Sequence, residues 1–357
     1  MTRLSMVVHG RDNNFHLVRL LAASAVLFSH SFPLSTGDVK TEPLRALLGC
    51  TPGSIAVDLF FTISGLLVTM SLVRRDSVAD FLRARFFRIW PALTVAIGLA
   101  VLIIGPIFTT STLPAYFSSH DTWRHLAKNL VLLRGIEYTL PGVFDGNPQH
   151  AINGSLWTLP SEVKCYLYLL AGWIVVRKLT SEKTFRIFVT LVWAALFCWH
   201  CWSVTHTTLE DSPARLGLMF TSGVALYLYR DAPVLSWRWL GAVLAALAFS
   251  TLNLKAWSIL YVLAIPYVML CLAYLPRGRI LRFNRLGDYS YGVYVYAYPV
   301  QQTLMCLVPA LGPIALFGAS MTVTLAMAVL SWHFVERPAL CLARPAARAV
   351  PLATSAA

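Results

Sequence analysis

Residues 53–73 read GSIAVDLFFTISGLLVTMSLV, a stretch in which Asp58 is the only charged side chain. An α-helix rises about 1.5 Å per residue, so this stretch is long enough to cross the roughly 30 Å hydrocarbon core of a bilayer. Arg74 and Arg75 follow directly, and basic residues are typical of the cytoplasmic ends of transmembrane helices. The stretch therefore predicts a membrane-spanning helix.

The composition of the whole chain supports the same interpretation. Of 357 residues, 57% are hydrophobic and only 13% are charged, against about 25% charged in ordinary soluble domains. The formal net charge is nevertheless +13, from 29 Lys and Arg against 16 Asp and Glu. So sparse and biased a set of charges excludes a soluble enzyme, a disordered chain and a nucleic-acid-binding protein, which needs its basic groups on a wet, polar face. We therefore predict a polytopic protein whose partner is the lipid bilayer.

Apolar runs of similar length follow one another along the chain. They cover approximately residues 15–35, 53–73, 87–108, 156–176, 184–203, 213–230, 235–252, 257–275, 288–308 and 313–335. Each run is close to the length that a transmembrane helix requires. The sequence therefore predicts an all-α, polytopic integral membrane helical bundle of about ten transmembrane helices.

The basic residues are distributed as ten spans require when both termini are cytoplasmic. Of the 29 Lys and Arg residues, 21 fall in segments assigned to the cytoplasm and seven in segments assigned to the other side, while Lys164 lies inside the fourth span. The excess alternates from loop to loop, as the positive-inside rule predicts. Removing one helix would invert every later loop, so the charges favour both termini in the cytoplasm.

The domain organisation follows from these spans. We expect residues 1–340 to form one membrane domain and residues 341–357 a short cytoplasmic tail. A long extracytoplasmic loop is expected at about residues 109–155, and long loops are often binding surfaces. The aromatic residues in or beside this loop either stack on sugar rings or belong to the interfacial aromatic belt; they are Trp123, Tyr138 and Trp157.

Ionisable side chains inside spans are costly in hydrocarbon and are therefore candidates for function. In the first span, Arg19 and His30 are eleven residues apart, which places them on nearly the same helix face and about 16 Å apart along its axis. Asp58 in the second span and Glu162 in the fourth are predicted at a depth similar to that of His30. A carboxylate beside an imidazole fixes its tautomer and raises its basicity, which suits a general base. We therefore predict His30, Asp58 and Glu162 as catalytic residues.

Each of these residues also has a structural interpretation. Arg19 is placed to snorkel to the lipid head groups, and His30 to be a hydrogen-bonded histidine of the core. Asp58 is placed to cap the start of the second helix, and Glu162 to neutralise Lys164 or a neighbouring helix. The sequence leaves both sets of interpretations open.

A basic cluster is predicted at the inner end of the bundle. Arg85 and Arg88 lie three residues apart at the mouth of the third span, at a depth comparable with that of Arg19. Guanidinium groups match phosphate oxygens bidentately, so the cluster is either a membrane anchor or a phosphate site. Ser64 and Gly65 either permit close helix packing or line a narrow channel. A basic mouth, an apolar slot and a histidine under the outer face fit a donor with a phosphate-rich head and a long thin arm, such as coenzyme A.

Five motifs in chain order carry a resemblance to a known family. They are Arg19 and His30 as Arg-x10-His, Val57–Gly65 (VDLFFTISG), Arg85 and Arg88 as Arg-x-x-Arg, Asn153–Glu162 (NGSLWTLPSE) and Ser290–Tyr294 (SYGVY). The chain resembles the acyltransferase-3 family of membrane O-acyltransferases over nearly its whole length. Members of this family modify bacterial surface and secreted glycans, including O-antigens, exopolysaccharides and lipo-chitooligosaccharide signals.

The resemblance implies an acyltransferase-3-like domain in the bacterial cytoplasmic (inner) membrane. Such an enzyme moves an acyl group, most often acetyl, from cytoplasmic acyl-CoA to a hydroxyl of a glycan or glycolipid acceptor, and we expect no metal. Arg19, Arg85 and Arg88 would bind the phosphates of acetyl-CoA, and His30 would act as the general base or carry the acyl group itself. Some relatives have a second histidine in the ninth helix, where this chain has Ala297.

Two other classes of protein compete with the enzyme. A transporter or flippase also carries charged residues along its helix faces, but it predicts inverted repeats or paired broken helices, which are not evident in the sequence. A non-catalytic membrane scaffold leaves the cost of several ionisable groups inside the membrane unexplained. The acyltransferase is the interpretation that gives these residues a use.

Overall fold

The stretch at residues 53–73 lies in one continuous helix, α4 (Pro52–Arg75), as predicted. A reciprocal cap closes its first turn: the Thr51 side chain accepts a hydrogen bond from the Ser54 N–H (3.1 Å), and the Ser54 hydroxyl accepts one from the Thr51 N–H (2.7 Å). Asp58 takes no part in this cap, so the interpretation of Asp58 as the helix cap is wrong. The helix ends at Asp76, which has a left-handed conformation.

Each of the ten predicted spans contains a helix in the computed structural model, which describes residues 2–10, 12–178 and 180–343. These helices are α2 (Phe15–Thr36), α4, α5 (Val78–Leu99), α9 (Leu159–Gly172), α10 (Glu182–Ser203), α11 (Arg215–Leu228), α12 (Trp237–Ser250), α13 (Leu254–Tyr274), α14 (Ser290–Leu307) and α15 (Pro313–Ser331). Seven helical segments of the described chain are long and apolar enough to cross a membrane, namely those built on α2, α4, α5, α9, α10, α13 and α15. These seven support a multi-pass membrane protein, and the count of ten stays a prediction.

Several shorter elements extend or connect these helices. Three long helices continue through π-helical turns: α5 through η2 (Ala100–Ile104) into α6 (Gly105–Phe108), α9 into η4 (Trp173–Lys178), and α15 through η6 (Trp332–Glu336) into α16 (Arg337–Leu342). The other short helices are α1 (Leu4–Val7), η1 (Val39–Thr41), α3 (Arg45–Leu48), α7 (Leu113–Ser118), α8 (His120–Val131), η3 (Gly154–Thr158) and η5 (Gly278–Arg285). Strands β1 (Thr2–Arg3) and β2 (Val234–Leu235) pair antiparallel, with Thr2 opposite Leu235.

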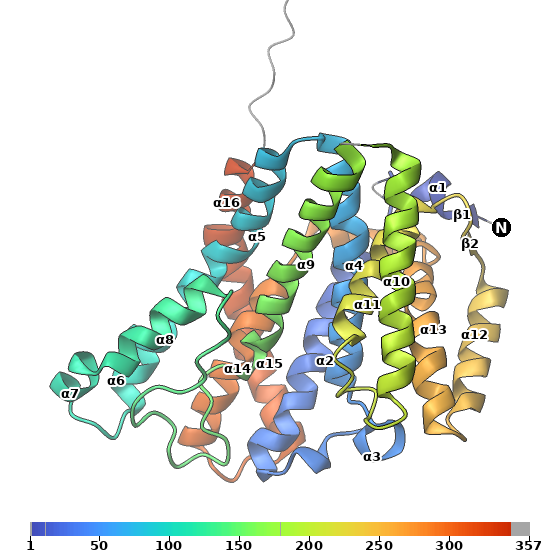
Figure 1. The fold of residues 1–357 in the computed structure, drawn as a ribbon. Coiled ribbons are helices and arrows are strands. Elements are labelled where there is room, and N and C mark those ends of the chain that lie inside the picture. The colour runs from blue at the N-terminus through green and yellow to red at the C-terminus, as the bar shows by residue number, and fades with distance from the viewer. Residues whose placement is uncertain (1, 11, 179, 344–357) are drawn as a thin grey trace, which may run out of the picture.

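The long helices run side by side and alternate in direction along the chain (Figure 1). The N-terminal segment and α16 lie at the same end of the bundle. The sides of the membrane on which the two termini lie stay a prediction. The predicted tail at residues 341–357 lies outside the described residues from position 344 onward, and the assignment of this end to the cytoplasm stays a prediction.

The segment predicted as a long loop is partly helical and packs on the bundle. Its helix α8 runs back along α5, and the Trp90 indole N–H donates a hydrogen bond to the Leu130 carbonyl (2.8 Å). Further along, the Asn153 side-chain amide donates to the Val295 carbonyl in α14 (2.8 Å). These two hydrogen bonds hold the segment against α5 and α14.

Two glycines bring α4 and α11 into backbone contact. A Cβ atom at Gly65 would lie 2.0 Å from the Phe220 carbonyl oxygen, and a Cβ atom at Gly223 would lie 2.1 Å from the Thr62 carbonyl oxygen. Of the two roles predicted for the small residues of α4, Gly65 therefore serves close packing. Its neighbour Ser64 lines a cavity.

We expect Gly223→Ala to destabilise the bundle by about 1–3 kcal/mol, because the added methyl group forces α4 and α11 apart. Gly241→Ala is the matched control, since a Cβ atom at Gly241 in α12 would have no neighbour within 4 Å and alanine favours a helix. Thermal unfolding in detergent micelles measures both variants. Equal unfolding temperatures for the two variants would contradict the contact between α4 and α11.

Candidate functional site

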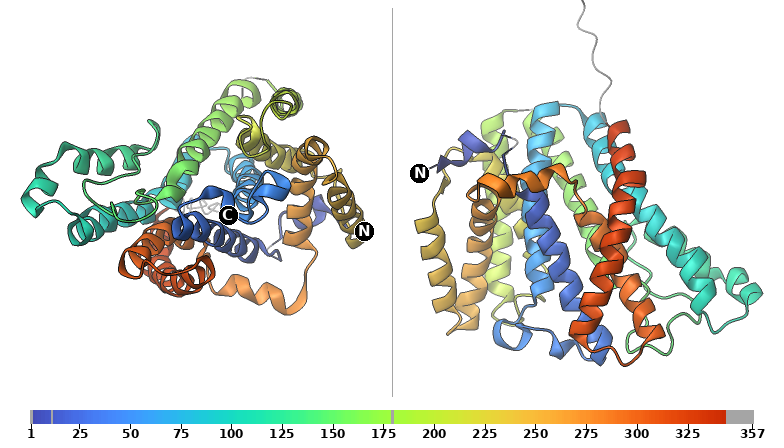
Figure 2. Two further views of the ribbon diagram at one scale, coloured as in Figure 1. Left: turned by 90° about the horizontal axis from the view of Figure 1, so that it is seen from below. Right: turned by 180° about the vertical axis from the view of Figure 1, so that it is seen from behind.

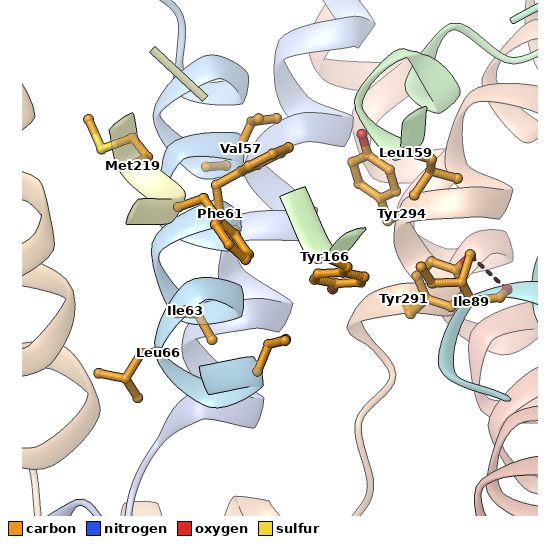
Figure 3. Close-up of a cluster of buried hydrophobic side chains, with 14 of the residues drawn as sticks. Val57, Phe61, Ile63, Leu66, Ile89, Leu159, Tyr166, Met219, Tyr291 and Tyr294 are labelled. Atoms are coloured by element: carbon orange, nitrogen blue, oxygen red, sulfur yellow. Dashed lines mark hydrogen bonds between the residues drawn. The ribbon is translucent and has the colours of Figure 1, made fainter. Parts of the chain in front are cut away.

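A cavity opens among α2, α4, α5, α9 and α14. Figure 3 shows Tyr166 between Phe61 of α4 on one side and Tyr291 and Tyr294 of α14 on the other. The wall is largely apolar but includes charged and hydroxyl side chains. Its lining residues are Arg19, Val57, Phe60, Phe61, Ile63, Ser64, Leu67, Val68, Arg85, Arg88, Ile89, Thr158, Leu159, Glu162, Tyr166, Ser290, Tyr291 and Tyr294.

The cavity brings together four of the six predicted site residues. The three arginines predicted to bind phosphate and Glu162 all line it, although they come from α2, α5 and α9. His30 and Asp58 do not line it. The structure thus groups the predicted donor-binding residues and places two of the three predicted catalytic residues elsewhere.

The Asp288 carboxylate joins two of the cavity arginines. Its Oδ2 accepts hydrogen bonds from Arg19 Nη1 (2.5 Å) and Arg88 Nη2 (2.8 Å), and its Oδ1 accepts one from the Ser290 N–H at the start of α14 (3.3 Å). Arg88 also lies 4.0 Å from Glu336. The Asp288 side chain is only 6% exposed, so solvent screens these charges weakly. Asp288 therefore ties α2, α5 and α14 together.

Arg85 has no ion pair to a carboxylate in the described residues, unlike the other two arginines. Its guanidinium lies over the Tyr166 ring, 5.8 Å from the centroid. Its Nε atom is buried without a hydrogen-bond partner. Buried donors are normally satisfied, so this arrangement favours an anionic ligand at Arg85.

Glu162 belongs to a hydrogen-bonded cluster on the wall of the cavity. The Tyr166 hydroxyl donates to Glu162 Oε1. The Ser64 hydroxyl lies 2.8 Å from the Tyr166 hydroxyl and 3.3 Å from Glu162 Oε1. No ion pair joins Glu162 to Lys164 among the described residues, so its partners here are hydroxyl groups.

Asp58 of α4 forms a buried ion pair away from the cavity lining. Its Oδ2 accepts hydrogen bonds from Arg215 Nη1 (3.1 Å) and from the Tyr261 hydroxyl (2.8 Å). The Asp58 and Arg215 side chains are 0% and 2% exposed, and the contacts link α4, α11 and α13. In the described structure no hydrogen bond joins Asp58 to His30. The catalytic role of Asp58 stays a prediction, while its packing role is directly visible.

His30 lies beside α14, farther along α2 than Arg19. Its ring packs edge-on against Tyr298, with the ring centroids 5.2 Å apart, and its Nδ1 is buried without a hydrogen-bond partner. The Gln301 amide fixes the same turn of α2 by donating to the Leu27 carbonyl (2.9 Å) and the Ser31 hydroxyl (2.7 Å). The protein therefore holds the imidazole in place and leaves Nδ1 unused.

Tyrosines of α14 connect His30 with the cavity. Tyr291 and Tyr294 line the cavity, and the Tyr294 hydroxyl lies 2.6 Å from the Thr158 hydroxyl on the facing wall. Tyr298 follows Tyr294 by four residues, about 6 Å along a helix, and faces His30. His30 thus contacts α14 one turn beyond the tyrosine that lines the cavity wall.

Three charged residues of these networks are missing from the predicted site: Asp288, Glu336 and Arg215. Asp288 is the first residue of the predicted ninth span and lies two residues before Ser290 of the Ser290–Tyr294 motif. An acidic residue at the terminus of a span was therefore the available signal. Arg215 is one of the seven basic residues that the charge count assigns to the extracytoplasmic side, and the structure buries its side chain against Asp58. Pairing these partners requires knowing which helices are neighbours.

Comparisons with known proteins give the family context of this site. A family model described as "Acyltransferase domain" matches residues 12–333. The chain is 32% identical to a protein named O-acetyl transferase from Shigella phage Sf6, over 94% of this chain and 98% of that protein. It is 31% identical to nodulation protein 10 of Rhizobium leguminosarum bv. viciae, over 93% of this chain and 94% of that protein. No solved structure matches the chain.

We expect Asp58→Leu alone to destabilise the protein by about 3–5 kcal/mol, because it leaves the Arg215 charge buried without its partner. The double variant Asp58→Leu/Arg215→Met removes both charges and should recover most of the stability. Thermal unfolding in detergent measures this recovery, and acyl transfer by the double variant should recover with it. A folded double variant without activity would instead assign Asp58 to the chemistry.

Proposed function

The chain belongs to the acyltransferase family whose domain model it matches, and we propose that it transfers an acetyl group from cytoplasmic acetyl-CoA to a hydroxyl of a cell-surface or secreted glycan. Membership of this family makes the protein an acyltransferase and decides against the transporter interpretation. The relative named O-acetyl transferase supports acetyl as the acyl group. The helices able to cross a membrane support a multi-pass protein, which we place in the bacterial inner membrane.

The observation that carries the donor assignment is that Arg85 shares a cavity with two further arginines and has no carboxylate partner in the described part of the chain. We infer that Arg85 binds a phosphate of acetyl-CoA directly, because it has no carboxylate partner among the described residues. Arg19 and Arg88 each give one hydrogen bond to Asp288, and a guanidinium carries five N–H donors. Their remaining donors supply further contacts to the phosphates. The apolar wall beyond the arginines then receives the pantetheine arm.

His30 is proposed to carry the chemical step. In direct transfer, an imidazole nitrogen removes the proton of the acceptor hydroxyl, whose oxygen attacks the thioester carbonyl carbon. The carbon–sulfur bond breaks, and the coenzyme A thiolate takes the proton from the imidazolium. In the alternative, a ring nitrogen of His30 attacks the thioester carbonyl carbon, the carbon–sulfur bond breaks, and the coenzyme A thiolate takes the proton of the imidazole ring. The acceptor oxygen then attacks the acyl carbon, and the imidazole leaves with the proton of the hydroxyl. The unused Nδ1 supports both routes.

The carboxylates have separate places in this proposal. Glu162 lies on the cavity wall with Tyr166 and Ser64, so we propose that it orients groups around the thioester. Among the described residues no hydrogen bond joins Glu162 to His30. Asp58 contributes through the helices that it holds together.

The acceptor is proposed to enter from the end of the bundle opposite the N-terminus. Trp157 is 40% exposed and directly precedes Thr158, which lines the cavity. Tyr138 is also 40% exposed. Of the three aromatic residues considered for sugar stacking, Trp157 is the one next to a cavity-lining residue in the sequence. We therefore propose that Trp157 stacks on the acceptor sugar.

We expect His30→Ala to reduce acyl transfer by roughly 100- to 10,000-fold, the contribution of a positioned acid–base group. His206→Ala is the control, because His206 is exposed and does not line the cavity. Mass spectrometry of glycans from cells carrying each variant at equal membrane abundance measures the acetyl increment. Wild-type acetylation by the His30 variant would refute its catalytic assignment.

Arg85→Ala should raise the apparent KM for acetyl-CoA by roughly 10- to 100-fold, as expected for the loss of a charge-assisted hydrogen bond. Arg83→Ala is a matched control on the same helix, since Arg83 is exposed and does not line the cavity. Initial rates at varied acetyl-CoA concentration separate the two variants. An unchanged KM in Arg85→Ala would return this residue to membrane anchoring.

A further inference from the structure

Four arginines occur in the nine residues around η5, and none has an ion pair in the described structure. Arg277, Arg279, Arg282 and Arg285 are all exposed. The same nine residues contain no acidic side chain. A concentrated positive charge without internal neutralisation attracts an external anion.

The same segment also exposes large apolar side chains. Ile280 is 37% exposed and Leu286 is 55% exposed. In the right view of Figure 2, η5 lies across the end of the bundle, between the vertical helices α13 and α14. In the left view, which looks along the bundle, η5 lies at the edge of the bundle. An amphipathic segment that lies perpendicular to the spanning helices has the orientation of an element in the membrane interface.

A groove at this place combines both kinds of side chain. Its lining residues are Leu17, Arg279, Ile280, Arg282, Phe283 and Leu286. Leu17 comes from α2, so the groove joins η5 to the first spanning helix. The opposite edge of η5 is fixed to the bundle by the Asn284 side-chain amide, which donates to the Asn13 carbonyl. Two guanidinium groups beside an apolar floor match a ligand with an anionic head and a hydrocarbon chain.

We propose that this groove binds one anionic phospholipid of the membrane leaflet at the N-terminal end of the bundle. Its phosphate lies on Arg279 and Arg282, and an acyl chain covers Ile280, Phe283 and Leu286. A lipid is favoured over a free phosphate ion because the phosphate would leave the apolar floor uncovered. The site is separate from the cavity of Arg85, and the inference does not depend on the proposed acyl transfer.

The test measures phosphatidylglycerol binding to the purified full chain by native mass spectrometry. Arg279→Gln/Arg282→Gln should weaken this binding by about thirtyfold, since each arginine near an anionic membrane surface contributes about fivefold in affinity. Arg75→Gln/Arg337→Gln is the matched control: it removes the same charge from exposed positions at the same end of the bundle, outside the groove. The control should bind phosphatidylglycerol like the wild type.

Two results would overturn the proposal. Equal binding of phosphatidylglycerol by the two double variants would show that only total charge attracts the lipid. Displacement of phosphatidylglycerol by an equal concentration of inorganic phosphate would assign the groove to a free anion. Retained binding in the presence of phosphate, together with its loss in the groove variant alone, supports a phospholipid site.

Discussion

The hydrogen bonds of Asp288 to Arg19 and Arg88 are the interaction on which the candidate site depends. One carboxylate joins α2, α5 and the start of α14, which are three of the five helices around the cavity. In a low-dielectric surrounding, charges that lose their partner are far more costly than in water, so this junction strongly favours one arrangement of the helices. It also orients two cations toward the cavity while neutralising part of their charge.

The bundle contains a second buried carboxylate–arginine pair with a different consequence. Asp58 and Arg215 are almost fully buried, and their contacts join α4 to α11 and α13. The Asp288 network borders the cavity, whereas the Asp58 pair is enclosed by packed helices. Access to a cavity, rather than the presence of buried charge, therefore distinguishes the two pairs. Hydrocarbon makes any intramembrane charge unusual, but it does not by itself make the charge catalytic.

The arrangement along α2 and α14 fits the proposed reaction. Arg19 and His30 follow one another along α2, and the tyrosines of α14 pass from the cavity wall to the imidazole. A donor held by its phosphates near Arg85 would direct its thioester along this line. The acceptor hydroxyl would approach His30 from the other end. Acetyl-CoA and the glycan acceptor then enter from opposite ends of the bundle and meet at the histidine.

Much of this protein follows from the sequence alone. The apolar runs are long enough that hydrocarbon leaves them no stable form but a helix, so every predicted span contains one. Glu162 could be recognised as a candidate because ionisable residues inside spans are rare. The Arg-x-x-Arg pair could be recognised because neighbouring guanidinium groups match phosphate oxygens. Tertiary structure decided their partners: Glu162 with Tyr166, Asp58 with Arg215, and Arg19 and Arg88 with Asp288. A span fixes how deep a residue lies, but helix rotation and neighbour choice arise from contacts between distant segments, which local periodicity does not encode.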